Sequence, residues 1–255
     1  MDQSARLDHT VVVVTGASSG IGAVLAEEVA NRGGSVALTA RREALLRSVA
    51  GRCGNCSMVV AADLTRRAEV RRVVDAAIAQ FGRIDVWVNN AGQGITRNPS
   101  ELTDDDIDEM MRVNVKSALY AMQEVLPHFK SRGTGHVINV SSMLGRVPFA
   151  TFRSAYSGSK HFLNALTAMF RAEVQQTHPE IQFSTVSPNV VATEFGLNAR
   201  HGGPDSRTLP GGQTAEEVAA VIADVIVSRH PDVYTRPGFR DRVVEYYRSL
   251  SIDAS

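Results

Sequence analysis

Residues 10–22 read Thr-Val-Val-Val-Val-Thr-Gly-Ala-Ser-Ser-Gly-Ile-Gly. A β-branched run, typical of a buried strand, meets a turn with three glycines, and a helical pattern follows over residues 23–31. Glycine lets such a turn bend and lets a pyrophosphate approach the backbone, while the helix N-terminus offers unpaired N–H groups. The spacing is G-x-x-x-G-x-G, so the turn only approximates the usual G-x-G-x-x-G dinucleotide fingerprint.

The same turn also matches a second motif. Gly16-Ala17-Ser18-Ser19-Gly20 fits G-x-S-x-G, the nucleophile elbow of serine hydrolases, and it lies between a predicted strand and a predicted helix. An elbow requires earlier strands, one of which is followed by a loop that supplies an oxyanion donor. Only the polar residues 1–9 precede this strand, so its position in the chain disfavours a hydrolase.

Short β-branched runs recur between helical patterns along the chain. Seven strands are predicted, at 10–15, 35–39, 57–61, 84–89, 136–140, 182–186 and 232–235. Between the third and fourth, one apolar helical stripe is formed by Val70, Val73, Val74, Ala77, Ile78 and Phe81. Apolar strands that alternate with such helices predict an α/β fold, a doubly wound parallel seven-stranded sheet with helices on both faces (Rossmann fold). Residues 1–255 are predicted to form a single domain.

Two capping boxes predict where helices begin. Thr103 with Asp106, and Thr214 with Glu217, each precede an apolar-periodic stretch. The predicted helices cover about 104–130 and 214–228.

The segment 189–213 has a different composition. It is rich in glycine and proline and also holds Phe195 and Leu197. It follows the sixth predicted strand at its carboxyl end, where open parallel sheets bind ligands. We expect a substrate loop here; the alternative is a surface loop with no role.

The 255-residue chain has 27 Lys+Arg and 27 Asp+Glu, so its formal net charge is zero. This balance disfavours nucleic acid and anionic membranes as partners. The cluster Arg66–Arg72 is interleaved with Glu69 and is interpreted as a solvated helix face. No apolar run reaches the roughly 18 residues of a membrane span. We therefore expect a cytoplasmic protein without a nucleic-acid or membrane partner.

Cys53 and Cys56 form the single C-x-x-C of the sequence. A metal or redox site would need further Cys or His ligands, or a thioredoxin-like strand just before the pair. Since the sequence offers neither, we expect two reduced thiols in a loop and no metal.

The second predicted strand ends in Leu38-Thr39-Ala40-Arg41-Arg42, with no acid before Glu43. In a dinucleotide site this strand end faces the adenosine ribose, where a carboxylate binds the 2′-hydroxyl of NAD and an Arg accommodates the 2′-phosphate of NADP. Guanidinium groups bind phosphate, which a carboxylate would repel. Arg41 and Arg42 therefore favour NADP(H) over NAD(H). The alternative is an Arg pair that opens a solvated helix.

Tyr156-Ser157-Gly158-Ser159-Lys160 places a tyrosine and a lysine at i and i+4, on one helix face. A free phenol has a pKa of about 10, and an adjacent ammonium lowers it, so the pair can share a proton-transfer step. Only three of the 27 basic residues are lysines, which suggests that a compact amine is required at position 160. Ser157-x-x-Lys160 also matches the S-x-x-K acyl-enzyme motif, but neither S-D-N nor K-T-G follows.

Over residues 10–195 the chain resembles the short-chain dehydrogenase/reductase family. Four segments match the cofactor motifs of that family: the glycine turn, the acid that contacts the adenine ring, the NNAG after the fourth strand, and the segment P-G-x-x-x-T. The resemblance implies cofactor contacts from Gly16, Ser18, Ser19, Gly20, Ile21, Gly22, Asp63, Leu64, Asn90, Ala91, Gly92, Tyr156, Lys160, Pro188, Val191 and Thr193, together with Arg41 and Arg42.

The resemblance also implies four catalytic residues. Tyr156 would be the acid in reduction and the base in oxidation, and Lys160 would lower its pKa and bind the nicotinamide ribose. Ser142 would hydrogen-bond the substrate oxygen, and Asn114 would anchor a water that joins Lys160 to solvent. The implied reaction is hydride transfer between a nicotinamide and a carbonyl or alcohol.

This sequence departs from the family pattern at two places. Asn189 stands where the family usually has Gly, which is expected to alter the turn beside the nicotinamide. Ser142 and Tyr156 are 14 positions apart, which is expected to add a residue to a substrate-facing loop. Neither departure removes a catalytic group.

An apolar or ring-bearing substrate is expected, because apolar residues follow the fifth strand and lie in the 189–213 segment. The predicted pocket comprises Met143, Leu144, Val147, Phe149, Phe152, Phe195 and Leu197.

The helix that carries Tyr156 is apolar on several faces, which indicates burial in the monomer or at a subunit interface. With the family resemblance, this predicts a homodimer or homotetramer formed through this helix and the one at 104–130. Two other function classes stay open: an NAD(H)-dependent dehydrogenase of the same family, and a catalytically silent NADP-binding sensor. The sensor would not need Ser142, Tyr156 and Lys160 together.

Overall fold

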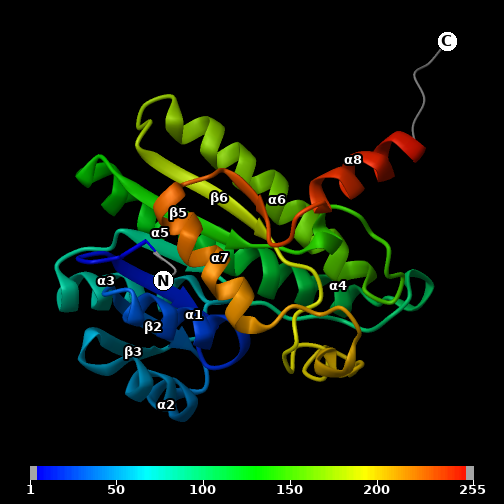
Figure 1. The fold of residues 1–255 in the computed structure, drawn as a ribbon, viewed down its shortest axis with the longest axis horizontal. Coiled ribbons are helices and arrows are strands. Elements are labelled where there is room, and N and C mark those ends of the chain that lie inside the picture. Colours follow the sequence, from blue (N-terminus) through cyan, green and yellow to red (C-terminus); the bar gives the residue numbers. More distant parts are fainter. Residues whose placement is uncertain (1–4, 251–255) are drawn as a thin grey trace.

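A seven-stranded sheet with helices on both faces makes up the computed structural model, which describes residues 5–250 (Figure 1). All neighbouring strands are parallel, in the order β3-β2-β1-β4-β5-β6-β7. The strands are β1 (Val11–Thr15), β2 (Ser35–Ala40), β3 (Ser57–Ala61), β4 (Val86–Asn89), β5 (Gly135–Val140), β6 (Ile181–Ser187) and β7 (Asp232–Tyr234). The predicted doubly wound fold is confirmed, and each predicted strand ends within two residues of an observed one.

The strands are apolar on both sides because each face of the sheet is covered. Val12 and Val14 of β1 pack in the core beneath one helical layer, while Val13 belongs to the core on the opposite face. The first layer contains α1 (Gly20–Asn31), α2 (Glu43–Cys53) and α7 (Ala215–Ser228), and the second contains α3 (Arg67–Phe81), α5 (Ser117–Arg132) and α6 (Ser154–Gln175). The C-terminal helix α8 (Phe239–Leu250) extends away from both layers (Figure 1).

Both predicted capping boxes are present. The Thr103 hydroxyl accepts from the backbone N–H of Asp106 (3.3 Å) at the start of α4 (Asp104–Met111), and the Thr214 hydroxyl accepts from that of Glu217 (3.1 Å) at the start of α7.

The helix predicted at 104–130 differs from a single α-helix. A π-helical turn over Arg112–Lys116 separates α4 from α5, and α5 continues to Arg132. This π-helical turn is wider than an α-helical turn, and it contains the buried side chain of Asn114.

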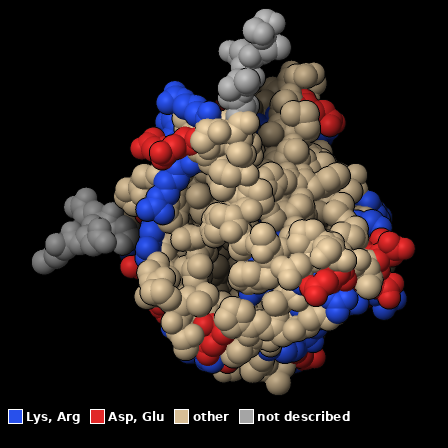
Figure 2. Space-filling view, turned by 90° about the vertical axis from the view of Figure 1, so that its right-hand side faces the viewer, with Lys and Arg blue, Asp and Glu red and all other residues tan. Residues whose placement is uncertain are grey.

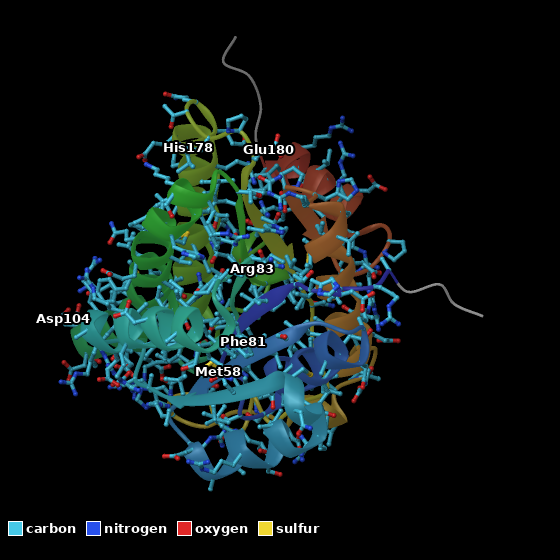
Figure 3. All side chains as sticks on the ribbon, turned by 90° about the vertical axis from the view of Figure 1, so that its left-hand side faces the viewer. Met58, Phe81, Arg83, Asp104, His178 and Glu180 are labelled. Carbon is cyan, nitrogen blue, oxygen red and sulfur yellow. The ribbon has the colours of Figure 1, made fainter. Side chains whose placement is uncertain are left out.

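Successive strands are added to one side of the sheet from β1 to β3 and to the other side from β4 to β7. The boundary between β1 and β4 is the position where open parallel sheets bind ligands. Figure 2 looks onto the side of the molecule where the strands end; the face is hollowed, mostly uncharged, and bordered by charged side chains. At the opposite end, shown in Figure 3, Arg83 precedes β4, and His178 and Glu180 mark the turn from α6 to β6. There Asp85 fixes the start of the sheet, because its carboxylate accepts from the backbone N–H of Val11 (2.8 Å).

Cys53 and Cys56 are free thiols at the end of α2 and in the short turn after it. Burial raises the pKa of the Cys53 thiol to about 11, so it is a weak nucleophile at neutral pH. Within residues 5–250, no three or more His, Cys or acidic side chains are grouped so that they could hold a metal ion. None of the helices in that range is both long and apolar enough to cross a membrane.

Candidate active site

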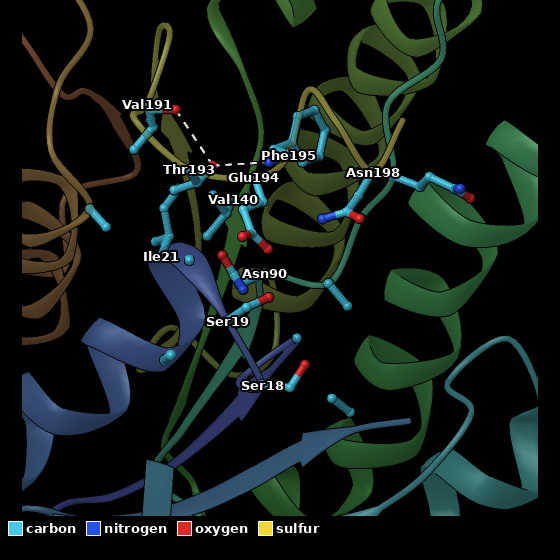
Figure 4. Close-up of a pocket in the computed structure, with 18 of the residues that line it drawn as sticks. Ser18, Ser19, Ile21, Asn90, Val140, Val191, Thr193, Glu194, Phe195 and Asn198 are labelled. Carbon is cyan, nitrogen blue, oxygen red and sulfur yellow. Dashed lines mark hydrogen bonds between the residues drawn. The ribbon is translucent and has the colours of Figure 1, made fainter. Parts of the chain in front are cut away.

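A cavity of about 770 Å³ opens at the carboxyl ends of the strands. In Figure 4, Ser18, Ser19 and Ile21 before and within α1 lie on one side of it, and Thr193, Glu194 and Phe195 of the 189–213 loop lie on the other. Nearly all of the predicted site residues line this cavity: Gly16, Ser18, Ser19, Gly20, Ile21, Arg41, Arg42, Asp63, Leu64, Asn90, Ala91, Gly92, Ser142, Tyr156, Lys160, Pro188, Val191 and Thr193.

The two predicted site residues that do not line the cavity are Gly22 and Asn114. A Cβ at position 22 would lie 2.5 Å from the side-chain nitrogen of Asn90 and 2.6 Å from the carbonyl oxygen of Gly16. Gly22 therefore lets α1 begin directly against the turn and does not itself face the cavity.

Gly16 keeps the turn narrow beside the NNAG segment. Its φ is +67°, and a Cβ there would lie 2.9 Å from the Cα of Ala91. The side chain of Asn90 donates to the carbonyl of Thr15 (2.9 Å), and the Thr15 hydroxyl accepts from the backbone N–H groups of Asn90 and Ala91 (2.9 Å each). These bonds join the ends of β1 and β4 beneath the cavity.

Arg42 bends back over the glycine turn. Its guanidinium donates to the hydroxyls of Ser18 (3.0 Å) and Ser19 (2.8 Å). Glu43, the first acid after the strand, does not line the cavity. Its carboxylate accepts a hydrogen bond from Arg47, one helical turn later (3.0 Å). The end of β2 and the glycine turn after β1 therefore present two guanidinium groups and two hydroxyls to the cavity.

Asp63 lines the cavity where β3 ends. Its carboxylate accepts from the backbone N–H (3.1 Å) and the hydroxyl (2.8 Å) of Thr65. Its pKa lies below the usual value: burial opposes the shift, and the Thr65 bonds and the charges of Arg112 and Arg41 outweigh it.

Tyr156 and Lys160 lie one turn apart near the start of α6, and both are buried. The Lys160 Nζ is 5.8 Å from the centre of the Tyr156 ring and donates to the carbonyl of Val140 (2.8 Å) at the end of β5. Ser142 follows β5, lines the same cavity, and accepts from the backbone N–H of Leu144 (3.1 Å). The three side chains from β5 and α6 converge on one wall of the cavity.

Burial shifts the proton affinities of both α6 groups. It raises the pKa of Tyr156 to about 12, against opposing effects of the Ser142 hydroxyl and the Arg153 charge. This rise is opposite to the lowering by Lys160 that the sequence predicted, because the phenol is removed from water. It lowers the pKa of Lys160 to about 8. The charged form is disfavoured in each case, so the neutral phenol is the stable form of Tyr156 near pH 7.

Asn114 lies in the π-helical turn behind the cavity wall. Its amide accepts from the backbone N–H of Gln93 (2.8 Å) and donates to the Gln93 carbonyl (2.9 Å) and to the hydroxyl of Ser159 (3.1 Å). It thereby ties the loop after β4 to α6. A Cβ at Gly92 would lie 3.1 Å from Asn114 Oδ1 and 3.7 Å from Lys160 Nζ, so both side chains flank that glycine.

The predicted apolar pocket is assembled only in part. Phe195 lines the cavity and packs edge-on against Tyr156, with ring centres 5.5 Å apart. Met143 and Val147 are buried in the protein, whereas Phe149 is 60% exposed. Leu144, Phe152 and Leu197 also lie outside the cavity lining. Of the seven residues predicted for the apolar pocket, Phe195 is therefore the one that lines the cavity.

The 189–213 loop is closed at its base and is joined near its tip to the segment after β4. Val191 pairs with Gln213 near its base, and Ile95 pairs with Arg200 near its tip. Asn189 has a negative φ, so the turn accepts it without strain.

A buried carboxylate holds the tip of this loop. Asp106, at the start of α4, accepts from Arg200 Nε (2.6 Å) and pairs with His201 Nε2 (2.8 Å) and with Arg97 (3.4 Å). The sequence indicated Asp106 only as a capping residue; its charged partners come from loops far away in the chain.

Further residues line the cavity that the sequence did not indicate. They are mostly polar and include Glu27, Arg52, Gln93, Glu194, Asn198 and Arg207. Spacing alone offers no signal for Glu27, Arg52 and Gln93, which come from α1, α2 and the loop after β4. Glu194, Asn198 and Arg207 belong to the 189–213 segment, which the sequence indicated only as a whole.

The chain matches the family model described as short chain dehydrogenase over residues 10–202. An uncharacterised oxidoreductase of Staphylococcus epidermidis is 33% identical over 223 residues, which are 88% of this chain and 91% of that protein.

Solved structures with the same fold carry nicotinamide ligands. The 3-ketoacyl-(acyl-carrier-protein) reductase of Brucella melitensis, complexed with NADH, is 26% identical with a TM-score of 0.80, and the match covers 89% of this chain and 96% of that one. An alcohol dehydrogenase of the archaeon Thermococcus sibiricus, complexed with 5-hydroxy-NADP, is 25% identical with a TM-score of 0.76, and the match covers 90% and 97%.

Proposed function

Because this chain belongs to the short-chain dehydrogenase family, we propose that it is an NADP(H)-dependent enzyme that interconverts a carbonyl group and an alcohol. The observation that carries the proposal is the convergence of Ser142, Tyr156 and Lys160 on the cavity that also meets the glycine turn. Residues 1–255 would act as one domain, with residues 189–213 as the substrate loop.

The residues fit an NADP(H) cofactor. The turn before α1 brings backbone N–H groups to the cavity, and Gly16 lets this turn pack closely against Ala91. Arg41, Arg42 and the hydroxyls of Ser18 and Ser19 offer donors for a 2′-phosphate. When bound, the cofactor supplies or accepts the hydride.

Side chains of the protein would transfer the proton to the carbonyl oxygen of the substrate. A phenol with a raised pKa holds its proton near neutrality, so Tyr156 is suited to donate it to the oxygen of a carbonyl substrate. Ser142 would hydrogen-bond the same oxygen, where partial negative charge develops. Lys160 would hold the nicotinamide ribose and stabilise the tyrosinate, and Asn114 would anchor the water that reconnects Lys160 with solvent.

The substrate is proposed to be a small molecule with an apolar part. The Phe195 ring, packed edge-on against Tyr156, gives an apolar surface beside the reacting group. A catalytically silent sensor would have no use for a buried Tyr–Lys–Ser set, because burying a lysine costs free energy. An NAD(H)-dependent enzyme is the second candidate, since the Brucella relative was solved with NADH.

The test is the rate of NADPH and of NADH oxidation with a panel of ketones, aldehydes, keto-steroids and β-ketoacyl thioesters. We expect NADPH to be preferred, and we expect Arg41→Gln with Arg42→Gln to lower kcat/KM for NADPH by about 10- to 100-fold. NADH rates should be unchanged. The matched control is Arg47→Gln, which removes a guanidinium from the same helix outside the cavity lining. A strong NADH preference of the unmodified enzyme would refute the NADP(H) assignment.

A further inference from the structure

Arg153 is a buried cation that has no carboxylate partner. Arg153 is 7% exposed to solvent. The guanidinium makes one hydrogen bond to the described residues, from Nη1 to the carbonyl of Ile95 (3.1 Å). Within residues 5–250, no carboxylate oxygen lies within 4.0 Å of it. Burying an unpaired charge is costly in free energy, so an anion is expected to bind there.

The acids of this region already have other partners. Asp106 is shared among Arg200, His201 and Arg97. On the 189–213 loop, Asp205 and Glu194 both pair with Arg207. The region around Arg153 therefore carries an excess of positive charge. Burial lowers the pKa of Arg153, and the one opposing charge is that of an ionised Tyr156.

Arg153 lies on the substrate side of the proposed catalytic tyrosine. It is the N-cap residue of α6, three residues before Tyr156, and its charge acts on the Tyr156 phenol. A Cβ at Gly94 would lie 3.0 Å from both Arg153 Nη1 and Phe195 Cε1, so the guanidinium and the Phe195 ring meet over that glycine. Phe195 lines the cavity and Arg153 does not (Figure 4 shows the Phe195 ring).

A second polar group without a hydrogen-bond partner in residues 5–250, the hydroxyl of Thr96, lies near the Arg153 guanidinium. This hydroxyl is buried. A Cβ at Gly203 would lie 2.8 Å from this hydroxyl and 3.1 Å from Arg153 Nη2, so both groups approach the 189–213 loop at one point. Nε and Nη2 of Arg153, which form the side edge of the guanidinium, have no partner among the described residues. This edge matches the two oxygens of a carboxylate or a phosphate.

We propose that Arg153, with Thr96, binds an anionic group of the substrate, a carboxylate or a phosphate. The inference rests on the proposed function, because it assigns the anion to the molecule whose carbonyl meets Tyr156. The substrate would have its apolar part against Phe195 and its anionic group beyond that ring. Phe195 turns away from Gly94 to admit the anionic group.

Matched pairs of substrates test the proposal. Each pair has one carbon skeleton, with a free keto acid compared to its methyl ester, and a keto phosphonate compared to its diester. We expect the enzyme to prefer the anion, and Arg153→Met to lower kcat/KM for the anion by about 10- to 100-fold while the ester changes less than about threefold. The preferred anion distinguishes a carboxylate from a phosphate.

The ratio of kcat/KM for the anion to kcat/KM for its ester distinguishes a loss of anion recognition from a general loss of activity. A variant that disturbs Tyr156 or the fold lowers both members of a pair equally, and that result would overturn the proposal. Arg153→Gln provides a second variant if Arg153→Met does not fold. Arg97→Met is the matched control, since it removes a guanidinium that already has an acid partner, and it should leave the ratio unchanged.

A binding measurement distinguishes this proposal from the proposed function. Calorimetric dissociation constants are measured for an aryl carboxylate, its primary amide and an aryl phosphonate, with NADP⁺ present. If no panel compound is turned over, yet one anion binds at least about tenfold more tightly than the amide and loses this advantage in Arg153→Met, the proposed reaction fails and the anion site stands. Equal binding of anions and amide would overturn the anion site, whatever the turnover.

Discussion

Burial governs the proton chemistry of single residues at the proposed site. Tyr156 and Lys160 are both removed from water, and each is shifted towards its neutral form. A neutral phenol is ready to act as an acid, which suits carbonyl reduction. The ionised phenol needs stabilisation, which Ser142 and a cation can provide.

Lys160 should make the stability of the protein depend on pH. Its pKa of about 8 lies below the unfolded value of 10.5, so between these values the unfolded chain binds more protons and stability rises with pH. We expect the free energy of unfolding of the wild type, relative to Lys160→Met, to increase by about 2 kcal/mol from pH 8 to pH 10. Urea unfolding at both pH values checks this. An unchanged difference would mean that Lys160 titrates normally.

Single residues also show what the sequence could predict about the site. The i, i+4 spacing was enough to place Tyr156 and Lys160 side by side, because helix geometry is local. Arg153 could have been placed near Tyr156 by its position three residues earlier in the chain. Its lack of a carboxylate partner could not have been predicted, because that property depends on Ile95, Gly203 and Asp106, which reach it from other parts of the chain.

Among the elements, the tip of the 189–213 loop is bound to α4 by the buried carboxylate of Asp106, in addition to its backbone pairing with Ile95. Asp106 combines a capping role on α4 with ion pairs to the loop, and these charged hydrogen bonds hold its pKa well below the usual range although burial opposes the shift. Its contribution to stability is therefore present above the usual carboxyl pKa and is lost as the pH falls.

The variant Asp106→Asn should release the tip of this loop. The side chain keeps its shape and a capping oxygen but loses the charge that pairs with Arg200 and His201. We expect backbone amides near residues 199–203 to exchange about tenfold faster or more, with little change in the sheet. Hydrogen–deuterium exchange measures this directly. Asp105→Asn, one residue earlier on α4, is the control; equal exchange in both variants would contradict the role of Asp106.

Periodicity and capping predicted the elements well because these are local properties. The seven strands and the starts of α4 and α7 follow from β-branched runs and from Thr103 and Thr214. The π-helical turn at Arg112–Lys116 was missed because an extra residue per turn does not change the apolar pattern enough to be seen. The apolar pocket was assigned too widely, since Met143 and Val147 pack into the protein.

For the whole molecule, α6 carries apolar side chains that the monomer does not cover. Phe162 is 50% exposed and Met169 is 63% exposed, and Ile107 on α4 is 43% exposed. Such side chains are typical of subunit interfaces when they gather on one helix. This supports the homodimer or homotetramer predicted from the sequence.

Sedimentation velocity at micromolar concentration tests the oligomer. We expect a dimer or tetramer for the wild type and dissociation for Phe162→Asp with Met169→Asp, because a desolvated carboxylate at an interface is unfavourable. Leu45→Asp on α2 is the control, being 42% exposed on a different helix. A monomeric wild type would contradict the prediction.

We propose that Tyr156 transfers the proton in an NADPH-dependent reduction, and this role is tested by measuring the turnover of Tyr156→Phe together with its affinity for NADPH. The substitution removes one hydroxyl and keeps the ring that packs against Phe195. We predict a loss of turnover of about 10²- to 10⁴-fold, with the dissociation constant for NADPH nearly unchanged. Turnover at the wild-type rate in Tyr156→Phe would exclude Tyr156 as the proton donor.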